Sequence, residues 1–76
     1  MTIRTLIVDD EPPAREKIAR HLSAHSDIRV VGECGDGESA VRGILDTNPD
    51  LIFLDIHLPE FDGFEVLRRA GKKRME

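Results

Sequence analysis

Acidic residues directly follow two hydrophobic segments of this 76-residue chain. The acids Asp-Asp-Glu at positions 9–11 come straight after residues 3–8, and Asp55 ends the segment Leu-Ile-Phe-Leu-Asp. Carboxylates a few ångströms apart repel one another unless a proton or a cation offsets their charge. A site made of oxygen ligands suits Mg²⁺, and an aspartate is also a nucleophile toward phosphorus. We therefore expect Asp55 to be reactive or metal-binding, with Asp9 and Asp10 as its partners.

The acids at positions 9–11 also have a plainer interpretation, because they precede a predicted helix. Acidic side chains at the start of a helix are stabilised by the helix dipole. That interpretation leaves Asp55 unexplained, since this carboxylate ends the most hydrophobic segment of the chain. The two features together favour a site over a simple helix start.

The segments that must position these acids alternate between strand and helix patterns. Strands are predicted at 3–8, 28–34 and 50–55. Amphipathic helices are predicted at about 13–24, after Asp36 and ending before Pro49, and from Asp62 to about Arg69. Such alternation is typical of a parallel sheet with right-handed crossovers. Segment 28–34 mixes β-branched with charged residues, as an edge strand does, so the predicted strand order is 2-1-3. Ligands gather at the switch point beyond the carboxyl ends of strands 1 and 3, which places Asp9, Asp10 and Asp55 in one crevice.

Local signals predict how the elements begin and pack. Asp36 is predicted to be the N-cap of the second helix, and Asp62 with Glu65 resembles a capping box for the third. The continuous apolar run 51–54 is typical of a strand covered on both faces. The apolar residues expected to pack the third helix against the sheet are Phe61, Phe64 and Leu67.

Composition restricts the class of protein. Residues 1–70 are predicted to form one small domain, and 71–76 a basic, solvated tail. The net charge of −4 gives no electrostatic case for direct nucleic-acid binding. No apolar run approaches the ~18 residues of a membrane span, so we expect a cytoplasmic protein.

The cysteine and two of the histidines are predicted to be structural or solvent-facing. Cys34 is the only cysteine, which excludes an internal disulfide and favours a reducing compartment. We expect its side chain to be a small apolar residue at a strand end. His21 and His25 are expected to face solvent on the first helix.

The acidic motifs, taken together, resemble the receiver domain of two-component response regulators. The resemblance spans residues 3–70 and implies a flavodoxin-like (CheY-like) α/β fold of βαβαβα order in three layers. The opening Asp-Asp-Glu-Pro-x-Ala-Arg and the segment Val31-Gly32-Glu33-Cys34 particularly resemble receivers joined to LytTR-type DNA-binding domains. The motifs that carry the family resemblance are Val8-Asp9-Asp10-Glu11-Pro12, Pro49-Asp50-Leu51-Ile52-Phe53-Leu54-Asp55-Ile56-His57-Leu58-Pro59 and Asp62-Gly63.

The resemblance assigns a role to each acidic residue. It implies that Asp55 is the phosphoacceptor for a histidine kinase, that Asp10 ligates Mg²⁺ directly, and that Asp9 assists partly through water. The main-chain carbonyl of His57 is implied as a further ligand. The chain is then a phosphoacceptor rather than an enzyme, with at most weak self-catalysed phosphorylation and dephosphorylation. Regulation of transcription is implied through an output domain that lies outside these residues.

The sequence departs from the family pattern after its third strand–helix unit. The family's fourth strand supplies a Ser or Thr for the phosphoryl oxygens, and its fifth a Lys for the phosphate; neither is present in these 76 residues. We therefore expect slow phosphoryl transfer, because groups that stabilise the transition-state charge are lacking. Strand 50–55 also becomes an exposed apolar edge, so we expect a homodimer through this strand or through exchanged elements.

The sequence bears on three alternatives to the phosphoacceptor role. A pseudo-receiver would act only as a dimerisation or interaction module. An aspartyl-phosphate phosphatase needs Asp-x-Asp on one strand, which Asp55-Ile56-His57 does not supply. A cobalamin site of the pattern Asp-x-His-x-x-Gly requires glycine where this chain has Glu60.

Overall fold

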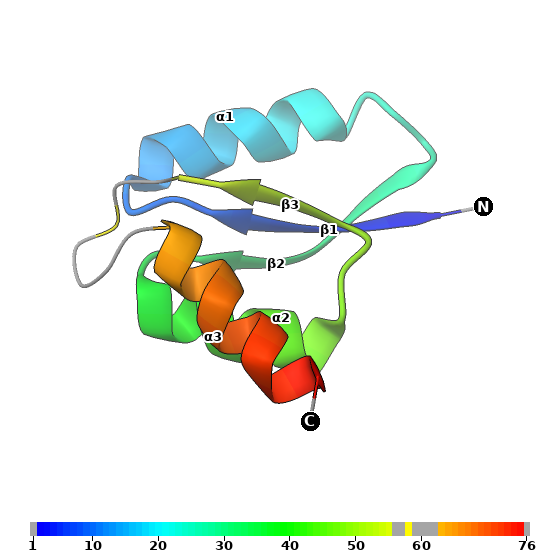
Figure 1. The fold of residues 1–76 in the computed structure, drawn as a ribbon. Helices are drawn as coiled ribbons and strands as arrows, with labels where there is room; N and C mark the ends of the chain where they lie inside the picture. The colour runs from blue at the N-terminus through cyan, green and yellow to red at the C-terminus, as the bar shows by residue number, and fades with distance from the viewer. Residues whose placement is uncertain (1, 56–57, 59–62, 76) are drawn as a thin grey trace.

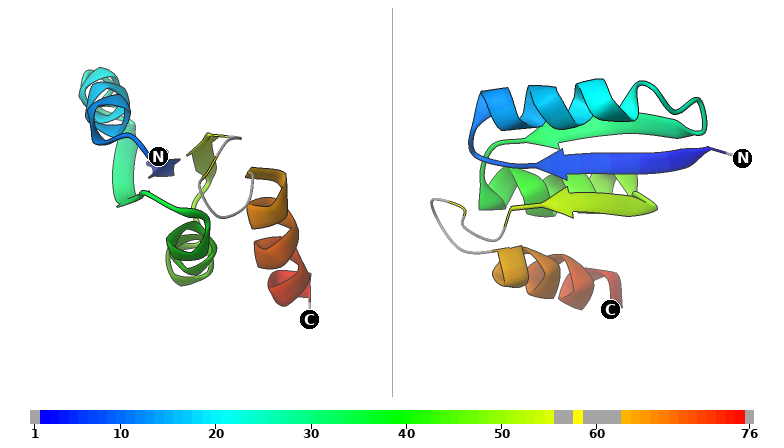
Figure 2. Two further views of the ribbon diagram at one scale, coloured as in Figure 1. Left: turned by 90° about the vertical axis from the view of Figure 1, so that its left-hand side faces the viewer. Right: turned by 90° about the horizontal axis from the view of Figure 1, so that it is seen from above.

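Three parallel strands and three helices alternate along the chain. The computed structural model describes residues 2–55, 58 and 63–75. The elements are β1 (Ile3–Val8), α1 (Pro12–Leu22), β2 (Ile28–Cys34), α2 (Gly37–Thr47), β3 (Leu51–Leu54) and α3 (Gly63–Met75). Over the described residues the sheet order is β2-β1-β3, so the predicted alternation and the 2-1-3 order are confirmed. α1 covers one face of the sheet and α2 and α3 cover the other, which gives three layers (Figure 1 and Figure 2).

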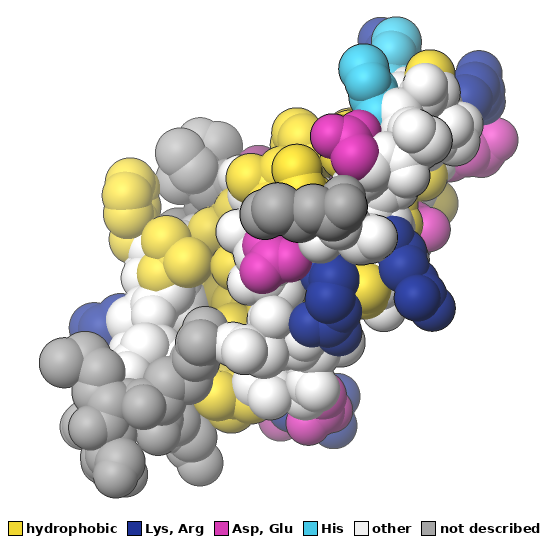
Figure 3. Space-filling model, turned by 90° about the vertical axis from the view of Figure 1, so that its right-hand side faces the viewer, with side chains coloured by type: hydrophobic (Ala, Val, Ile, Leu, Met, Phe, Trp, Pro, Cys, Tyr) yellow, Lys and Arg dark blue, Asp and Glu magenta, His cyan; other side chains and the backbone are white. Residues whose placement is uncertain are grey.

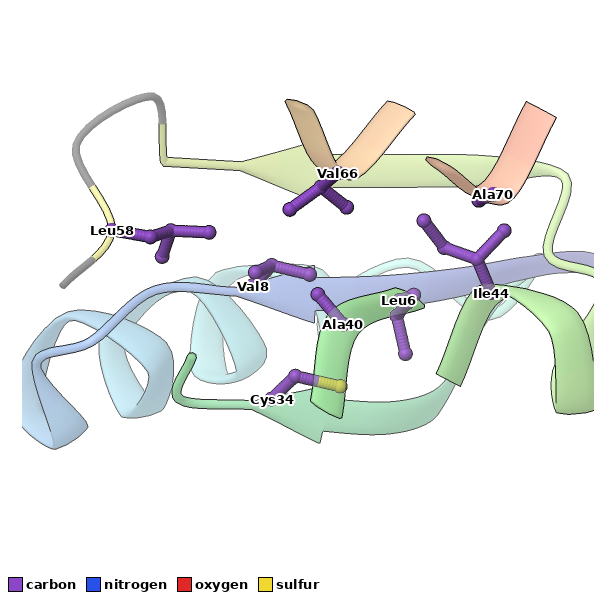
Figure 4. Close-up of a cluster of buried hydrophobic side chains, with 8 residues drawn as sticks. All are labelled: Leu6, Val8, Cys34, Ala40, Ile44, Leu58, Val66 and Ala70. Atoms are coloured by element: carbon purple, nitrogen blue, oxygen red, sulfur yellow. The ribbon is translucent and has the colours of Figure 1, made fainter. Parts of the chain in front are cut away.

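The central strand β1 is buried on both faces. Leu6 and Val8 point into the core under α2 and α3, and Ile7 on the opposite face has no exposed surface. Ile52 and Leu54 of β3 pack against the same core. The buried cluster shown in Figure 4 consists of Leu6, Val8, Cys34, Ala40, Ile44, Leu58, Val66 and Ala70.

The strand β3 lies at an edge of the described sheet and is covered on one face only. Leu51 is 40% exposed and Phe53 is 37% exposed, while Ile52 and Leu54 face the core. The expectation that this run is covered on both faces is therefore wrong, because α1 packs over β1 and β2. The expectation of an apolar edge strand is confirmed. The strand is assigned to residues 51–54 rather than 50–55, although the amides of Asp50 and Asp55 continue the hydrogen bonds to β1.

The strand β2 forms the other edge, as its charged residues predict. Arg29 and Glu33 are exposed. Its pairing with β1 skips Val31, the extra residue of a β-bulge. A Cβ atom at Gly32 would lie 3.0 Å from a methyl carbon of Leu6, so glycine permits the close approach of the two strands after the bulge.

Both ends of α2 are capped by side chains. The Ser39 amide donates a 2.7 Å hydrogen bond to Oδ1 of Asp36, which confirms the predicted N-cap. The helix ends before the proline, as predicted, at Asn48 in the left-handed region with φ 46°. The guanidinium of Arg4 donates to the carbonyls of Thr47 and Asn48. This contact satisfies the last carbonyls of α2 and joins them to the start of β1.

The helix α3 buries a different face from the one predicted. Phe64 is 68% exposed and Leu67 is 47% exposed, whereas Val66 and Ala70 are 0% and 2% exposed. Residues four apart lie on one face of a helix, so Val66 and Ala70 form the stripe that packs on the core. The expected contact of Phe61 lies outside the described residues.

The ends of α3 also differ from the prediction. The helix continues through Gly71 to Met75 instead of stopping near Arg69. A glycine costs a helix only about 1 kcal/mol relative to alanine, and the Lys-Lys-Arg run after it consists of good helix formers. Glu65 pairs with Arg68 and Arg69, while the Asp62 half of the expected capping box lies outside the described residues. α1 likewise spans 12–22 rather than 13–24.

The end of the molecule opposite the carboxyl ends of the strands has a mixed surface. Basic, acidic and hydrophobic side chains are interspersed there (Figure 3). His21 and His25 are exposed, as predicted, although His25 lies beyond the end of α1 rather than on it. No helix in the described part of the chain is long and apolar enough to cross a membrane.

Candidate functional site

Three aspartates meet at the carboxyl ends of β1 and β3. Asp9, Asp10 and Asp55 each offer a carboxylate oxygen, and these oxygens all lie within 4.8 Å of one another. Asp9 and Asp55 are half-buried and Asp10 is exposed. The structure thus brings together the three residues that the strand order places in one crevice.

The sheet itself fixes the main chain of two of these aspartates. The amide of Asp55 donates a 2.9 Å hydrogen bond to the carbonyl of Val8, and the amide of Asp9 donates a 3.0 Å bond to the carbonyl of Cys34. Each bond extends the ladder one residue beyond its strand. Asp9 and Asp55 therefore leave neighbouring strands at the same level, with their carboxylates side by side.

The loop between β1 and α1 holds the carboxylate of Asp9 in place. The amide of Glu11 donates a 3.0 Å hydrogen bond to Oδ1 of Asp9. This pairing of an aspartate with the amide two residues on is an Asx-turn. Proline occupies the first turn of α1, where its missing N–H leaves no hydrogen bond unmade.

A basic residue of α1, Arg15, also contacts this loop. Nη1 of Arg15 donates a 2.6 Å hydrogen bond to the carbonyl of Asp9. Nε of Arg15 lies 3.7 Å from Oε1 of Glu33 on β2. Arg15 is the last residue of the Asp-Asp-Glu-Pro-x-Ala-Arg opening, but its contact with Asp9 was not predicted from that motif.

A cavity of about 330 Å³ opens beside the aspartates. Apolar side chains from α1 and β3 and carboxylates from the strand ends share its lining. The lining residues are Val8, Asp9, Glu11, Ile18, Phe53, Leu54 and Asp55. A small anionic group that enters here would meet the carboxylates of Asp9, Glu11 and Asp55, so it requires a cation to offset their charge.

The oxygen donors fit a hard divalent cation. Mg²⁺ takes oxygen ligands, keeps several waters and uses one or two carboxylates. Asp10 is exposed, which leaves room for such waters. The predicted ligand His57 lies outside the described residues, as does the predicted cap Asp62.

Similarity to a known protein family identifies this arrangement of aspartates. The sequence model of the response regulator receiver domain matches residues 5–75. The chain belongs to the response regulator receiver family. Receivers of this family act in two-component phosphorelays, are phosphorylated by histidine kinases and bind Mg²⁺ at an acidic pocket.

Curated relatives share the receiver portion of longer proteins. The chain is 43% identical over 65 residues to the transcriptional regulatory protein BtsR of Salmonella typhi, covering 86% of this chain and 27% of that protein. It is 45% identical over 67 residues to protein-glutamate methylesterase/protein-glutamine glutaminase 1 of Syntrophus aciditrophicus, covering 88% of this chain and 19% of that protein. The chain thus spans about a quarter or less of these relatives.

Solved receivers have the same architecture. The response regulator domain of Thermotoga maritima CheB superposes with a TM-score of 0.91 at 36% identity, covering 96% of this chain and 55% of that one. A LuxR-family regulator from Aurantimonas gives 0.89 at 33% identity, covering 96% of this chain and 52% of that one. The CheY-like flavodoxin fold is therefore confirmed. These matches are to LuxR-type and CheB receivers, so the family is shown and the LytTR-type subfamily is not.

Proposed function

We propose that Asp55 accepts a phosphoryl group from a histidine kinase while Mg²⁺ is held by the carboxylates of Asp9, Asp10 and Asp55. The main-chain carbonyl of His57 is the further ligand in this proposal. The observation that supports it is the cluster of three carboxylates within 4.8 Å at the ends of β1 and β3. Such a cluster is electrostatically costly without a cation and suits a transfer reaction with one.

The proposed reaction is a displacement at phosphorus. A carboxylate oxygen of Asp55 forms the new P–O bond, and the P–N bond of the donor phosphohistidine breaks. The imidazole leaves with the bonding electrons and then takes a proton from solvent. Bound Mg²⁺ would neutralise the incoming phosphoryl oxygens. The hydrogen bond from the amide of Asp55 to Val8 fixes the main chain of the nucleophile.

We further propose that phosphorylation controls transcription in the cytoplasm. One relative is a transcriptional regulatory protein, which supports this output. The Asp-Asp-Glu-Pro-x-Ala-Arg opening supports an output of the LytTR type in particular. The chain itself is the phosphoacceptor in this scheme, and the kinase is the enzyme.

Binding of Mg²⁺ and of beryllium fluoride tests the phosphoacceptor role. We expect the ¹⁵N amide signals around positions 9–11 and 55 to shift with Mg²⁺ and again with beryllium fluoride. Asp55→Asn should abolish the second shift, and the exposed control Asp46→Asn should retain both. Unshifted signals in the wild type would refute the proposal.

Labelling by acetyl phosphate tests how well the 76-residue chain performs the transfer. We expect intact mass spectrometry to show one added phosphoryl group on the wild type and none on Asp55→Asn. The rate should fall short of that of a receiver with the Ser or Thr and the Lys by orders of magnitude, about 10²-fold or more for each lost charge-stabilising group. A rate equal to that of such a receiver would contradict this expectation.

The exposed edge of β3 supports a second candidate function, a dimerisation module. In the described part of the chain no strand pairs with the outer edge of β3, and Leu51 and Phe53 are exposed, so this edge is a template for pairing with a second copy. We expect the mass from light scattering to rise toward a dimer with concentration. Phe53→Glu should keep the protein monomeric, and Phe64→Glu, an exposed aromatic on α3, should not. A monomeric wild type at high concentration removes this candidate.

A further inference from the structure

Arg15 joins three parts of the molecule at the acidic cluster. The residue is in the first turns of α1, donates to the carbonyl of Asp9 at the end of β1, and pairs with Glu33 of β2. Its side chain is only 21% exposed, although it carries a charge. A partly buried arginine with two partners loses side-chain freedom and hydration, whereas a fully exposed surface arginine keeps both.

The loop at Gly35 leaves space for this side chain. A Cβ atom at position 35 would lie 3.2 Å from Nη1 of Arg15. A side chain there would displace the guanidinium by at least a few tenths of an ångström. Gly35 thus leaves room for Arg15 in its observed position beside Asp9.

The hydrogen bond from Arg15 acts on the peptide group that links two of the aspartates. The carbonyl of Asp9 and the amide of Asp10 belong to one planar unit. The amide of Asp9 is held by Cys34, and its carboxylate by Glu11. Arg15 adds a further anchor, on the carbonyl of the Asp9–Asp10 peptide itself.

We infer that Arg15 is a positioning residue that orients the Asp9–Asp10 peptide and so sets the affinity of the acidic cluster for Mg²⁺. The inference rests on the proposed metal site. Arg15 makes its contact with a carbonyl rather than with a carboxylate of the cluster, so it leaves the carboxylate oxygens to the metal. Partners that orient metal ligands in this way commonly change metal affinity by an order of magnitude or more.

Charge alone predicts the opposite sign. A guanidinium near three carboxylates repels a divalent cation, so its removal would tighten Mg²⁺ binding if electrostatics decided the outcome. If Arg15 instead orients the Asp9–Asp10 peptide, its removal would weaken Mg²⁺ binding. The direction of the change in Kd therefore separates the two explanations.

Calorimetric titration of the full chain with MgCl₂ tests the inference. We expect Arg15→Gln to raise the Kd about tenfold, and Arg15→Lys to raise it as well, because lysine keeps the charge and loses the two-pronged contact. Glu33→Gln should raise it less. The control Arg20→Gln removes a charge from the same helix where the side chain is 73% exposed and paired with Glu16, and its Kd should stay within about twofold of the wild type.

Amide hydrogen exchange without metal provides an independent measurement. We expect the amides of Asp10 and Glu11 to exchange faster in Arg15→Gln and at the wild-type rate in Arg20→Gln. An unchanged or lower Kd in both Arg15 variants overturns the inference. If Arg15→Gln does not fold, the Kd values of Arg15→Lys and Glu33→Gln for Mg²⁺ test the inference in its place. If the wild type binds no Mg²⁺, the proposed function fails, and unchanged exchange would then overturn the positioning role separately.

Discussion

The amide of Asp55 donates a 2.9 Å hydrogen bond to the carbonyl of Val8, the residue directly before Asp9. This one contact brings the ends of β1 and β3 level and places two carboxylates on adjacent strands. It uses main-chain atoms alone, so a change of side chain at position 55 leaves it intact. The geometry of the cluster and its charge can therefore be varied separately.

Asp10→Asn is expected to stabilise the metal-free protein and to remove its response to Mg²⁺. The substitution relieves repulsion among carboxylates within 4.8 Å of one another, and since Asp10 is exposed we expect a gain of up to about 0.5 kcal/mol in the free energy of unfolding. Mg²⁺ should raise the Tm of the wild type, since a ligand that binds only the folded state stabilises it. Circular dichroism suits both measurements, because the chain has no Trp or Tyr. Asp46→Asn on the exposed face of α2 is the control, and an equal Mg²⁺ response in Asp10→Asn would contradict the assignment.

Gly43→Ala should destabilise the fold, while Gly71→Ala should stabilise it. A Cβ at position 43 would lie 3.0 Å from Sγ of Cys34 and 3.5 Å from methyl carbons of Leu6, whereas a Cβ at position 71 would meet nothing within 4 Å. Overpacking costs about 1–3 kcal/mol, which exceeds the roughly 1 kcal/mol that alanine gains in a helix. At Gly71 no overpacking offsets the higher helix propensity of alanine, so the substitution should stabilise the fold. Urea unfolding followed by circular dichroism measures both changes, and a stabilised Gly43→Ala would show that α2 shifts away from Cys34 without cost.

The acidic cluster was predictable because it depends on topology. Alternating strand and helix patterns fix a parallel sheet, and a parallel sheet brings residues after β1 and β3 to one edge. Asp9, Asp10 and Asp55 follow from that rule without any knowledge of side-chain contacts. The edge position of β2 was likewise readable from its charged residues.

The contacts of Arg15 and the buried face of α3 were not predictable in the same way. Whether Arg15 reaches Asp9 depends on how α1 is rotated over the sheet, which apolar spacing determines only to within a residue or so. The usual preference for large apolar residues inside favours Phe64 and Leu67 over Ala70. α3 instead packs against α2 through Ala70 and Val66, since close contact between two helices favours small side chains.

Val66→Ala is expected to destabilise the protein far more than Phe64→Ala does. Val66 of α3 is fully buried in the core cluster, so its truncation leaves a cavity and should cost roughly 1–3 kcal/mol. Phe64 is 68% exposed, and its truncation should cost under about 0.5 kcal/mol. Urea unfolding of the two variants side by side measures the difference. A larger loss for Phe64→Ala would mean that α3 packs on the face first expected from the sequence.

The stability of the protein should fall in acid as Glu65 takes up a proton. Hydrogen bonds from Arg68, and then from Arg69, lower the pKa of Glu65 from 4.5 to about 2. A carboxyl group whose pKa is lower in the folded state stabilises the fold above its unfolded pKa and loses that contribution as the pH falls. The loss is therefore expected between about pH 4.5 and pH 2.

Titration of the Glu65 carboxyl carbon by ¹³C NMR measures the folded pKa directly, and Arg68→Gln should raise this pKa more than Arg69→Gln because Arg68 is the larger cause. Glu65→Gln should flatten the dependence of stability on pH in this window, and a wild-type midpoint near 4.5 would show that the two arginines do not hold the carboxylate in solution.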